Sequence, residues 1–261
     1  YIGTDVTGMV ALGNSSAGVS ISSSGINTIR GTTPAARNVI SSNGQQGVVI
    51  LPDVSASGNL VLGNYIGTDV SGTGDLGNSA QGVLILNGPN NTIGGTAAGA
   101  RNIIAGNDAE GIRIDGTSAT GTVIQGNYIG TDVTGAVALG NRADGVLLFG
   151  APNTIVGGSA VGAGNIISAS LLRPGVVVFG SGTVIQGNYI GIDEPADEQY
   201  GKAMSIPDDA ILDYFNLGTN VPVADVDAVQ SALDDGSVHP MEAKKRLAHA
   251  IVSEWHDSAA A

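Results

Sequence analysis

The chain has 261 residues, a formal net charge of -13 and no cysteine, which excludes disulfides and thiolate chemistry. Nucleic-acid affinity comes largely from Lys and Arg, so this acidic balance argues against a DNA or RNA partner. No apolar run reaches the roughly 18 residues that a membrane-spanning helix needs, and no membrane span is expected. Of the 41 glycines, 38 lie in residues 1–193, while residues 194–261 carry 13 acids against 4 bases. We therefore predict two domains, 1–193 and 194–261.

A seven-residue phrase recurs through the first domain. Gly-Asn-Tyr-Ile-Gly-Thr-Asp occupies residues 63–69 and 126–132, is truncated at residues 1–5, and returns with one substitution at 187–193. The tyrosines of the four copies are 64, 63 and 61 residues apart. This spacing predicts about three units arranged head to tail.

Each unit contains two shorter ones, which are marked by an Asn four residues before a Gly. These asparagines are 29, 35, 29 and 34 residues apart: Asn14, Asn43, Asn78, Asn107 and Asn141. After each Gly, β-branched and other apolar residues alternate with a period of two, as in Val83 and Ile85. Such alternation is typical of a strand with one buried face. Each unit also contains further short apolar runs, namely Asn-Thr-Ile, Asn-Ile-Ile and Val-Ile-Gln-Gly-Asn or variants of them.

These strands are too short to be stable alone, so they predict coils that stack on their own copies and pair in parallel. At about 4.8 Å per coil, about six coils give a rod on the order of 30 Å long. We expect an interior column of Val, Ile and Leu, and ladders of Asn side chains that bond along the axis.

The repeated motifs carry a resemblance to a known family. Asn-Thr-Ile-Gly-Gly-Thr at 91–96, Ala-Arg-Asn-Ile-Ile at 100–104 and the recurring seven-residue phrase resemble right-handed parallel β-helix repeats of bacterial surface and secreted proteins. The resemblance covers residues 1–193. It implies an all-β, right-handed, single-stranded parallel β-helix and an extracellular or cell-surface location, and it says little about activity.

One strand of the predicted rod carries a candidate site. Arg113 and Asp115 lie on the same outward face, between the apolar residues of the neighbouring coils. β-helix enzymes that act on polysaccharides need clustered carboxylates, often beside a basic residue. Arg113 and Asp115 are therefore the candidate substrate-binding residues, for a carbohydrate or a surface partner along the rod. A plain surface ion pair is the competing interpretation.

Other features of the rod have simpler explanations. An aspartate recurs before Thr-Gly or Ser-Gly, as in Asp69, and such a residue suits a turn in which the side chain bonds its own backbone. Calcium would need several oxygens that converge on one point, so we assign no metal site to these aspartates. No cofactor-binding or catalytic residue is assigned either. Outward apolar residues predict either an exposed strip that a missing partner segment or the C-terminal region covers, or a wrongly assigned facing: Leu84, Leu86, Leu147, Phe149, Val177 and Phe179.

After residue 193 the spacing becomes helical. Pro207 opens a predicted helix that contains Ile211 and Phe215, residues 224–233 form a second that stops at Gly236, and Pro240 opens a third. Three helices in so short a stretch are near the lower limit for an independent core.

A second resemblance covers residues 187–261. Residues 194–215 and 239–256 resemble the segment of bacterial tyrosyl-tRNA synthetase that follows the second ATP motif. At the place of that motif the chain has Ser-Gly-Thr-Val-Ile, residues 181–185, which is β-helix sequence. No ATP site or tyrosine pocket is therefore carried over, and His239, His249 and His256 are predicted to lie on helix surfaces.

Residues 187–191 fit both resemblances, so the chain reads as a chimera joined there, through recombination, an engineered fusion or an assembly error. We predict a non-catalytic structural or adhesive β-helical fragment joined to an inactive synthetase-like fragment of a cytoplasmic parent. The alternatives are a polysaccharide lyase or glycoside hydrolase of β-helix type, and a tyrosine–tRNA ligase.

Overall fold

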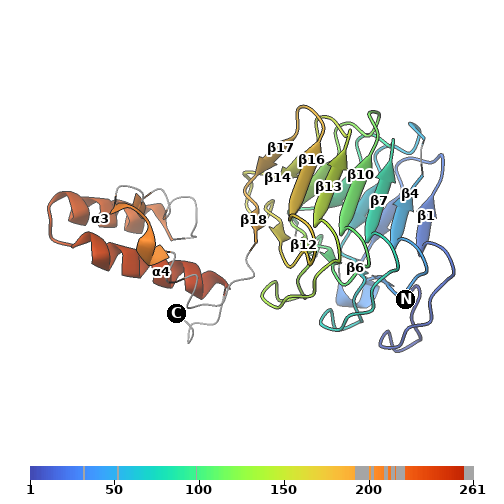
Figure 1. Ribbon diagram of the computed structural model, residues 1–261, viewed down its shortest axis with the longest axis horizontal. Coiled ribbons are helices and arrows are strands. Elements are labelled where there is room, and N and C mark those ends of the chain that lie inside the picture. The colour runs from blue at the N-terminus through green and yellow to red at the C-terminus, as the bar shows by residue number, and fades with distance from the viewer. Residues whose placement is uncertain are drawn as a thin grey trace. The chain divides into compact units, whose positions relative to one another are not determined.

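A computed structural model describes residues 1–191 apart from Thr32, Pro52 and Ala98, and beyond them Tyr200, 203–208, 211–212, Phe215 and 221–255. The chain divides into two compact units, Tyr1–Asp193 and Glu194–Ala261. The first unit is a parallel β-helix built from three sheets of six strands each (Figure 1). The fold class predicted from the repeats is confirmed.

The first sheet is formed by the strands that follow the recurring Asn and Gly. In spatial order its strands are β1 (Val19–Ile21), β4 (Val48–Ile50), β7 (Val83–Leu86), β10 (Ile112–Asp115), β13 (Val146–Phe149) and β16 (Val176–Phe179). Equivalent residues of successive strands pair in parallel, as Ile85 pairs with Ile114 and Ile114 with Leu148. Every third strand of the chain thus returns to this sheet, as Figure 1 shows.

The other two sheets repeat this arrangement on the remaining sides of the coil. The second contains β2 (Thr28–Arg30), β5 (Leu60–Leu62), β8 (Thr92–Gly94), β11 (Val123–Gln125), β14 (Ile155–Gly157) and β17 (Val184–Gln186). The third contains β3 (Val39–Ile40), β6 (Tyr65–Ile66), β9 (Ile103–Ile104), β12 (Tyr128–Ile129), β15 (Ile166–Ile167) and β18 (Tyr189–Ile190). A short 3-10 helix, Pro34–Ala36, precedes β3.

The interior of the β-helix is an aliphatic column, as the alternation of apolar residues predicted. Inward residues of all three sheets, such as Ile85, Ile124 and Ile129, are completely buried and belong to one cluster. Because the strands are in register, each branched side chain packs on its equivalents in the coils on either side. Burial of this column is the main stabilising contribution to the unit.

Three ladders of asparagine side chains run parallel to the column, and they confirm the second expectation for the interior. They contain Asn14–Asn43–Asn78–Asn107–Asn141, Asn27–Asn59–Asn91 and Asn38–Asn64–Asn102–Asn127–Asn165–Asn188. Each rung is an Nδ2 to Oδ1 hydrogen bond of 2.8 to 3.1 Å. The ladders satisfy polar groups at the corners, where the chain leaves one sheet for the next.

The recurring Tyr and Gly of the seven-residue phrase have separate roles at the third sheet. Arg37 lies over the ring of Tyr65 at 4.2 Å, and Arg101 lies over that of Tyr128 at 3.9 Å. Gly67, which follows Tyr65 and Ile66, has a φ of +91°, and a Cβ there would collide with the carbonyl oxygen of Ala105 in the next coil. Only glycine fits this corner.

The second unit is helical where it is described. Helices α3 (Val223–Asp234) and α4 (Pro240–Trp255) confirm the second and third predicted helices, and Gly236 with a φ of +73° follows α3. Its core combines Ile211 and Phe215 with residues of both helices, among them Val226, Val229, Ala243 and Leu247. The first predicted helix falls largely on residues outside the described set, and Pro207 itself is not helical. Among the described helices, none has the length and apolar character for a membrane crossing.

Candidate binding site on the first sheet

The predicted pair Arg113 and Asp115 lies on the outward face of β10, in the middle of the first sheet. Ile112 and Ile114 of the same strand point inward and are buried. Arg113 pairs in register with Leu84 and Leu147, and Asp115 pairs with Leu86 and Phe149. The neighbours that the repeats predicted for this strand are confirmed.

Arg113 is held by two carboxylates. Its Nε atom donates to Oδ1 and Oδ2 of Asp115, at 3.0 Å each, and its Nη1 atom donates to Oε1 of Glu110 at 3.3 Å. The Nη2 atom also lies 3.0 Å from Oδ2 of Asp115. The hydrogen bonds to Asp115 raise the pKa of the guanidinium, although partial burial acts in the opposite direction. Bidentate geometry makes this a stronger contact than a single surface ion pair. Whether the pair binds a substrate stays a prediction.

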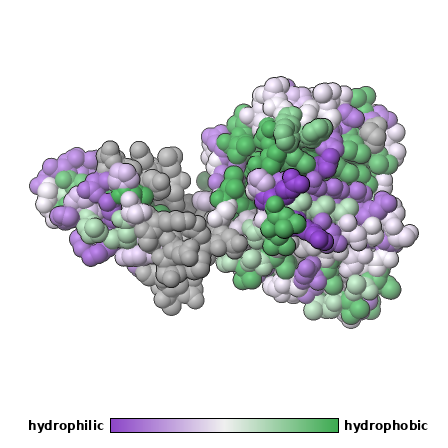
Figure 2. Space-filling model, viewed as in Figure 1, coloured by the Kyte–Doolittle hydropathy of each residue, from purple (hydrophilic) through white to green (hydrophobic). Residues whose placement is uncertain are grey.

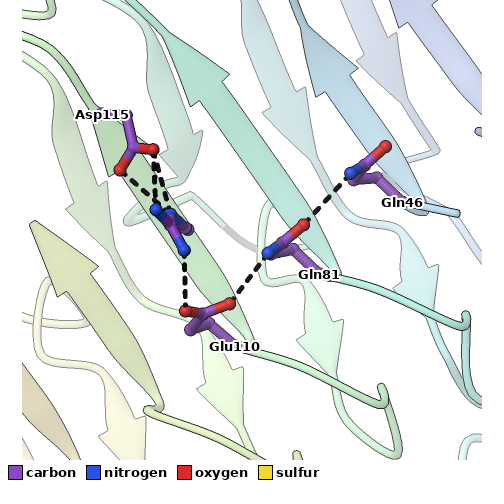
Figure 3. Close-up of polar contacts among 5 residues, drawn as sticks. Gln46, Gln81, Glu110 and Asp115 are labelled. Atoms are coloured by element: carbon purple, nitrogen blue, oxygen red, sulfur yellow. Dashed lines mark hydrogen bonds and ion pairs between the residues drawn. The ribbon is translucent and has the colours of Figure 1, made fainter. Parts of the chain in front are cut away.

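The pair belongs to a longer row of polar side chains that crosses three coils (Figure 3). Gln46 Nε2 donates to Gln81 Oε1 at 3.2 Å, and Gln81 Nε2 donates to Glu110 Oε2 at 2.9 Å. Glu110 then accepts from Arg113. Sequence reasoning missed this row, although its signal was available: each member of the row before Arg113 immediately precedes a recurring glycine.

Asp144 occupies the same position in the next coil, since it precedes Gly145 as Glu110 precedes Gly111. The N–H of Gly111 donates to the carbonyl oxygen of Asp144, so the two coils are in register here. Asp144 is only 6% exposed, and its Oδ1 atom has no hydrogen-bond partner. Burial raises the pKa of Asp144, and the charge of Glu110 raises it further.

Apolar residues surround this row, but the sequence misjudged how exposed they are. Leu84 and Leu147 are buried, which corrects the expectation of an exposed strip at these positions. Phe149 and Phe179 are more than half exposed, and their rings meet edge to face with centroids 5.7 Å apart. In Figure 2, apolar surface on this side of the β-helix surrounds a band of hydrophilic surface. The exposed part of the strip is thus the aromatic pair at the end of β13 and β16.

The recurring aspartates Asp5, Asp69 and Asp132 form turns, as predicted, and Asp193 lies outside the described residues. Oδ1 of Asp69 accepts from Ser71 Oγ at 2.6 Å and from the N–H of Thr73 at 3.3 Å, and a bridge between Thr68 and Asp75 closes the loop. Asp132 bonds Thr134 in the same way. Burial tends to raise the pKa of Asp69, but the hydrogen bond from Ser71 and those from the main chain outweigh it and lower the pKa overall. Among the described residues there is no group of three or more possible metal ligands.

A mixed-charge hollow lies in the helical unit. Its volume is about 390 Å³, and it is lined by Tyr200, Glu242, Lys245, Arg246 and His249. Lys245 and Glu242 form an ion pair at 2.7 Å. His249 is exposed on α4, as predicted, whereas His239 is exposed but lies just before that helix, and His256 lies outside the described residues.

The fold and the face of the first sheet together define a class: a parallel β-helical repeat unit with one charged and aromatic face, joined to a small helical unit. No family model matches the chain, and no solved structure matches it significantly.

Curated relatives match one stretch of the chain. Over 75 residues, or 29% of the chain, it is 52% identical to a tyrosine–tRNA ligase of Geobacter sulfurreducens, of which it covers 19%. Over the same length it is 49% identical to the corresponding ligase of Moorella thermoacetica and 44% identical to that of Dehalococcoides mccartyi. The chain thus spans about a fifth of the length of these relatives. A partial likeness to tyrosyl-tRNA synthetase, inferred from residues 187–261, is therefore confirmed.

Proposed function

We propose that residues 1–193 are a non-catalytic structural or adhesive β-helical fragment of a bacterial surface or secreted protein. The observation that carries this proposal is the engagement of Arg113 by Asp115 and Glu110 together. The carboxylates of Asp115 and Glu110 are engaged by Arg113, while the guanidinium, with five N–H donors, keeps donors for a partner. The face is suited to holding a partner rather than to transforming it.

We further propose that residues 194–261 have no ligase activity of their own. The likeness to tyrosine–tRNA ligases covers about a fifth of those proteins. The place of the second ATP motif is taken by β-helix sequence, which forms strand β17. A helical unit without either ATP motif has no means of activating tyrosine. The parent of this unit would be cytoplasmic, and the parent of the β-helix would be extracellular or bound to the cell surface.

The enzymatic alternatives are tested by two assays on the full chain. One follows the release of unsaturated or reducing ends from pectin-like polysaccharides, and the other follows tyrosine-dependent exchange of pyrophosphate into ATP. We expect no turnover in either. Turnover of a polysaccharide would replace the proposal with a lyase or hydrolase, and pyrophosphate exchange would replace it with a ligase.

The adhesive role is tested by binding to a saccharide array and to cell-wall polysaccharide. Arg113→Ala should weaken binding by about tenfold, which corresponds to about 1.4 kcal/mol. Arg30→Ala is the matched control, because Arg30 lies exposed on the second sheet. No binding by the unaltered chain would leave the structural role and refute the adhesive one. An equal loss in both variants would show that the first sheet is not the binding face.

A further inference from the structure

The row of polar side chains on the first sheet contains a conflict between Glu110 and Asp144. From Gln46 to Gln81 and from Gln81 to Glu110, an amide N–H of one coil donates to an oxygen of the next. Glu110 cannot continue this pattern as a carboxylate, because a carboxylate only accepts. Asp144 stands at the next position, and it too is acceptor-only when ionised. Both positions therefore carry an acceptor where the pattern of the row requires a donor.

Glu110 and Asp144 occupy equivalent positions of neighbouring coils, and both are buried. Equivalent positions of paired strands are about 4.8 Å apart, and the N–H of Gly111 bonds the carbonyl oxygen of Asp144. Glu110 is 7% exposed and Asp144 is 6% exposed. Burial and the nearby charge of Glu110 therefore both disfavour the ionised form of Asp144.

The charges around Asp144 do not resolve the conflict. Glu110 and Arg113 act on it from the preceding coil, and Arg173 acts from the following turn. Arg113 is already paired with Asp115 and Glu110, so its charge is only partly available to Asp144. Arg173 is exposed, so solvent screens the charge of Arg173. Oδ1 of Asp144 is buried without a hydrogen-bond partner, and an unsatisfied buried acceptor is costly.

We propose that Asp144 keeps a proton that supplies the missing donor and makes Asp144 a pH-sensitive element of the β-helix. In the protonated state, the O–H of Asp144 donates toward Glu110, whose carboxylate is bound to Gln81 and Arg113. As pH rises, the proton leaves to solvent, and the buried Asp144 carboxylate faces the charge of Glu110 without a hydrogen-bond donor. Burial of both residues excludes a sugar ring from this position, so the pair is distinct from any saccharide contact at the exposed Phe149 and Phe179.

The direction of the pH effect follows from linkage. The folded-state pKa of Asp144 lies above its unfolded value of 3.8. Its contribution to stability is therefore present at low pH and is lost as pH rises through the folded-state pKa. Above that pKa the folded chain carries the cost of an ionised, buried Asp144.

The test compares the full chain with Asp144→Asn, whose amide supplies the donor at every pH. We expect its Tm to exceed that of the unaltered chain by about 2–6 °C near pH 7, and the difference to shrink on acidification. Asp108→Asn is the control, because Asp108 is exposed two residues from Glu110 and should give no pH-dependent difference. A Tm difference that does not vary with pH would overturn the proposal.

A direct readout covers the case in which Asp144→Asn does not fold. Carbon-13 NMR titration of the carboxyl groups should give an Asp144 pKa above 3.8, and Glu110→Gln should lower it. A value at or below 3.8 in the unaltered chain would overturn the proposal. So would a rise of Tm on adding calcium that is lost in Asp144→Asn, since the pair would then hold a cation and not a proton.

Discussion

The asparagine ladders should contribute far more to stability in their middle than at their ends. Asn78 is completely buried, and its Nδ2 donates to Asn107 Oδ1 at 2.9 Å and to the carbonyl oxygen of Ile40 at 3.0 Å. Its Oδ1 accepts from the side chain and the main-chain N–H of Asn43, at 2.9 and 3.1 Å. Asn78→Ala removes all four bonds and leaves buried groups unsatisfied on both sides. At about 1–3 kcal/mol for each group left without a partner, we expect a loss of about 3–6 kcal/mol.

Asn14 of the same ladder is the matched control. It is exposed, and its Nδ2 donates to Asn43 Oδ1 at 2.8 Å from one side only. Asn14→Ala should cost about 1 kcal/mol, because water can replace the lost donor.

The assay is urea unfolding followed by far-UV circular dichroism, with the slope of the transition checked for a change in cooperativity. The reasoning is tested by the difference between the losses of unfolding free energy in Asn78→Ala and Asn14→Ala. Losses that agree within about 0.5 kcal/mol would refute the reasoning, since burial and bond number would then not control the contribution of a rung.

Three further predictions concern the core, the turns and the stacked tyrosines. Ile124→Ala should cost about 2–5 kcal/mol in the same unfolding assay, because Ile124 is fully buried in the column; a loss below about 1 kcal/mol would show that the column collapses around the cavity. Since the pKa of Asp69 is lowered in the folded state, Asp69 should stabilise the fold at pH values above its unfolded pKa of 3.8, and this stabilisation should be lost as pH falls through the folded pKa. Asp69→Asn should abolish this pH dependence when Tm is followed during acidification, and an unchanged profile would contradict the prediction. Arg101→Ala should cost about 1–2 kcal/mol and Arg101→Lys less, because Arg101 lies over Tyr128; equal losses would assign the effect to its hydrogen bond with Gly126.

Much of the β-helix could be predicted because it repeats. The spacing of Asn78 and Asn107 defines one coil, and the alternation of Val83 and Ile85 defines which side is inside. Together these fix the register between coils, and register is what produces both the ladders and the core. Helices α3 and α4 were equally visible from their apolar spacing and from Pro240.

The features missed are those that depend on distances between coils. Leu84 and Leu147 alternate outward, yet they are buried, and period two alone reports facing and not solvent exposure. Glu110 and Asp144 are 34 residues apart in sequence, and each occupies a variable position of the motif, just before the recurring glycine. Their proximity becomes visible only when the coils are aligned on the following glycine, and their burial requires coordinates.

All three asparagine ladders have one direction. In each, the Nδ2 of a lower-numbered residue donates to the Oδ1 of the next, from Asn38 through to Asn188 in the longest ladder. Aligned hydrogen bonds polarise one another, so their dipoles add along the axis instead of cancelling. The two ends of the β-helix are therefore chemically different: a coil added after β18 must accept from the ladder, whereas one added before β1 must donate to it. The β-helix therefore has a polarity along its axis, and the direction of its side-chain amide hydrogen bonds sets that polarity.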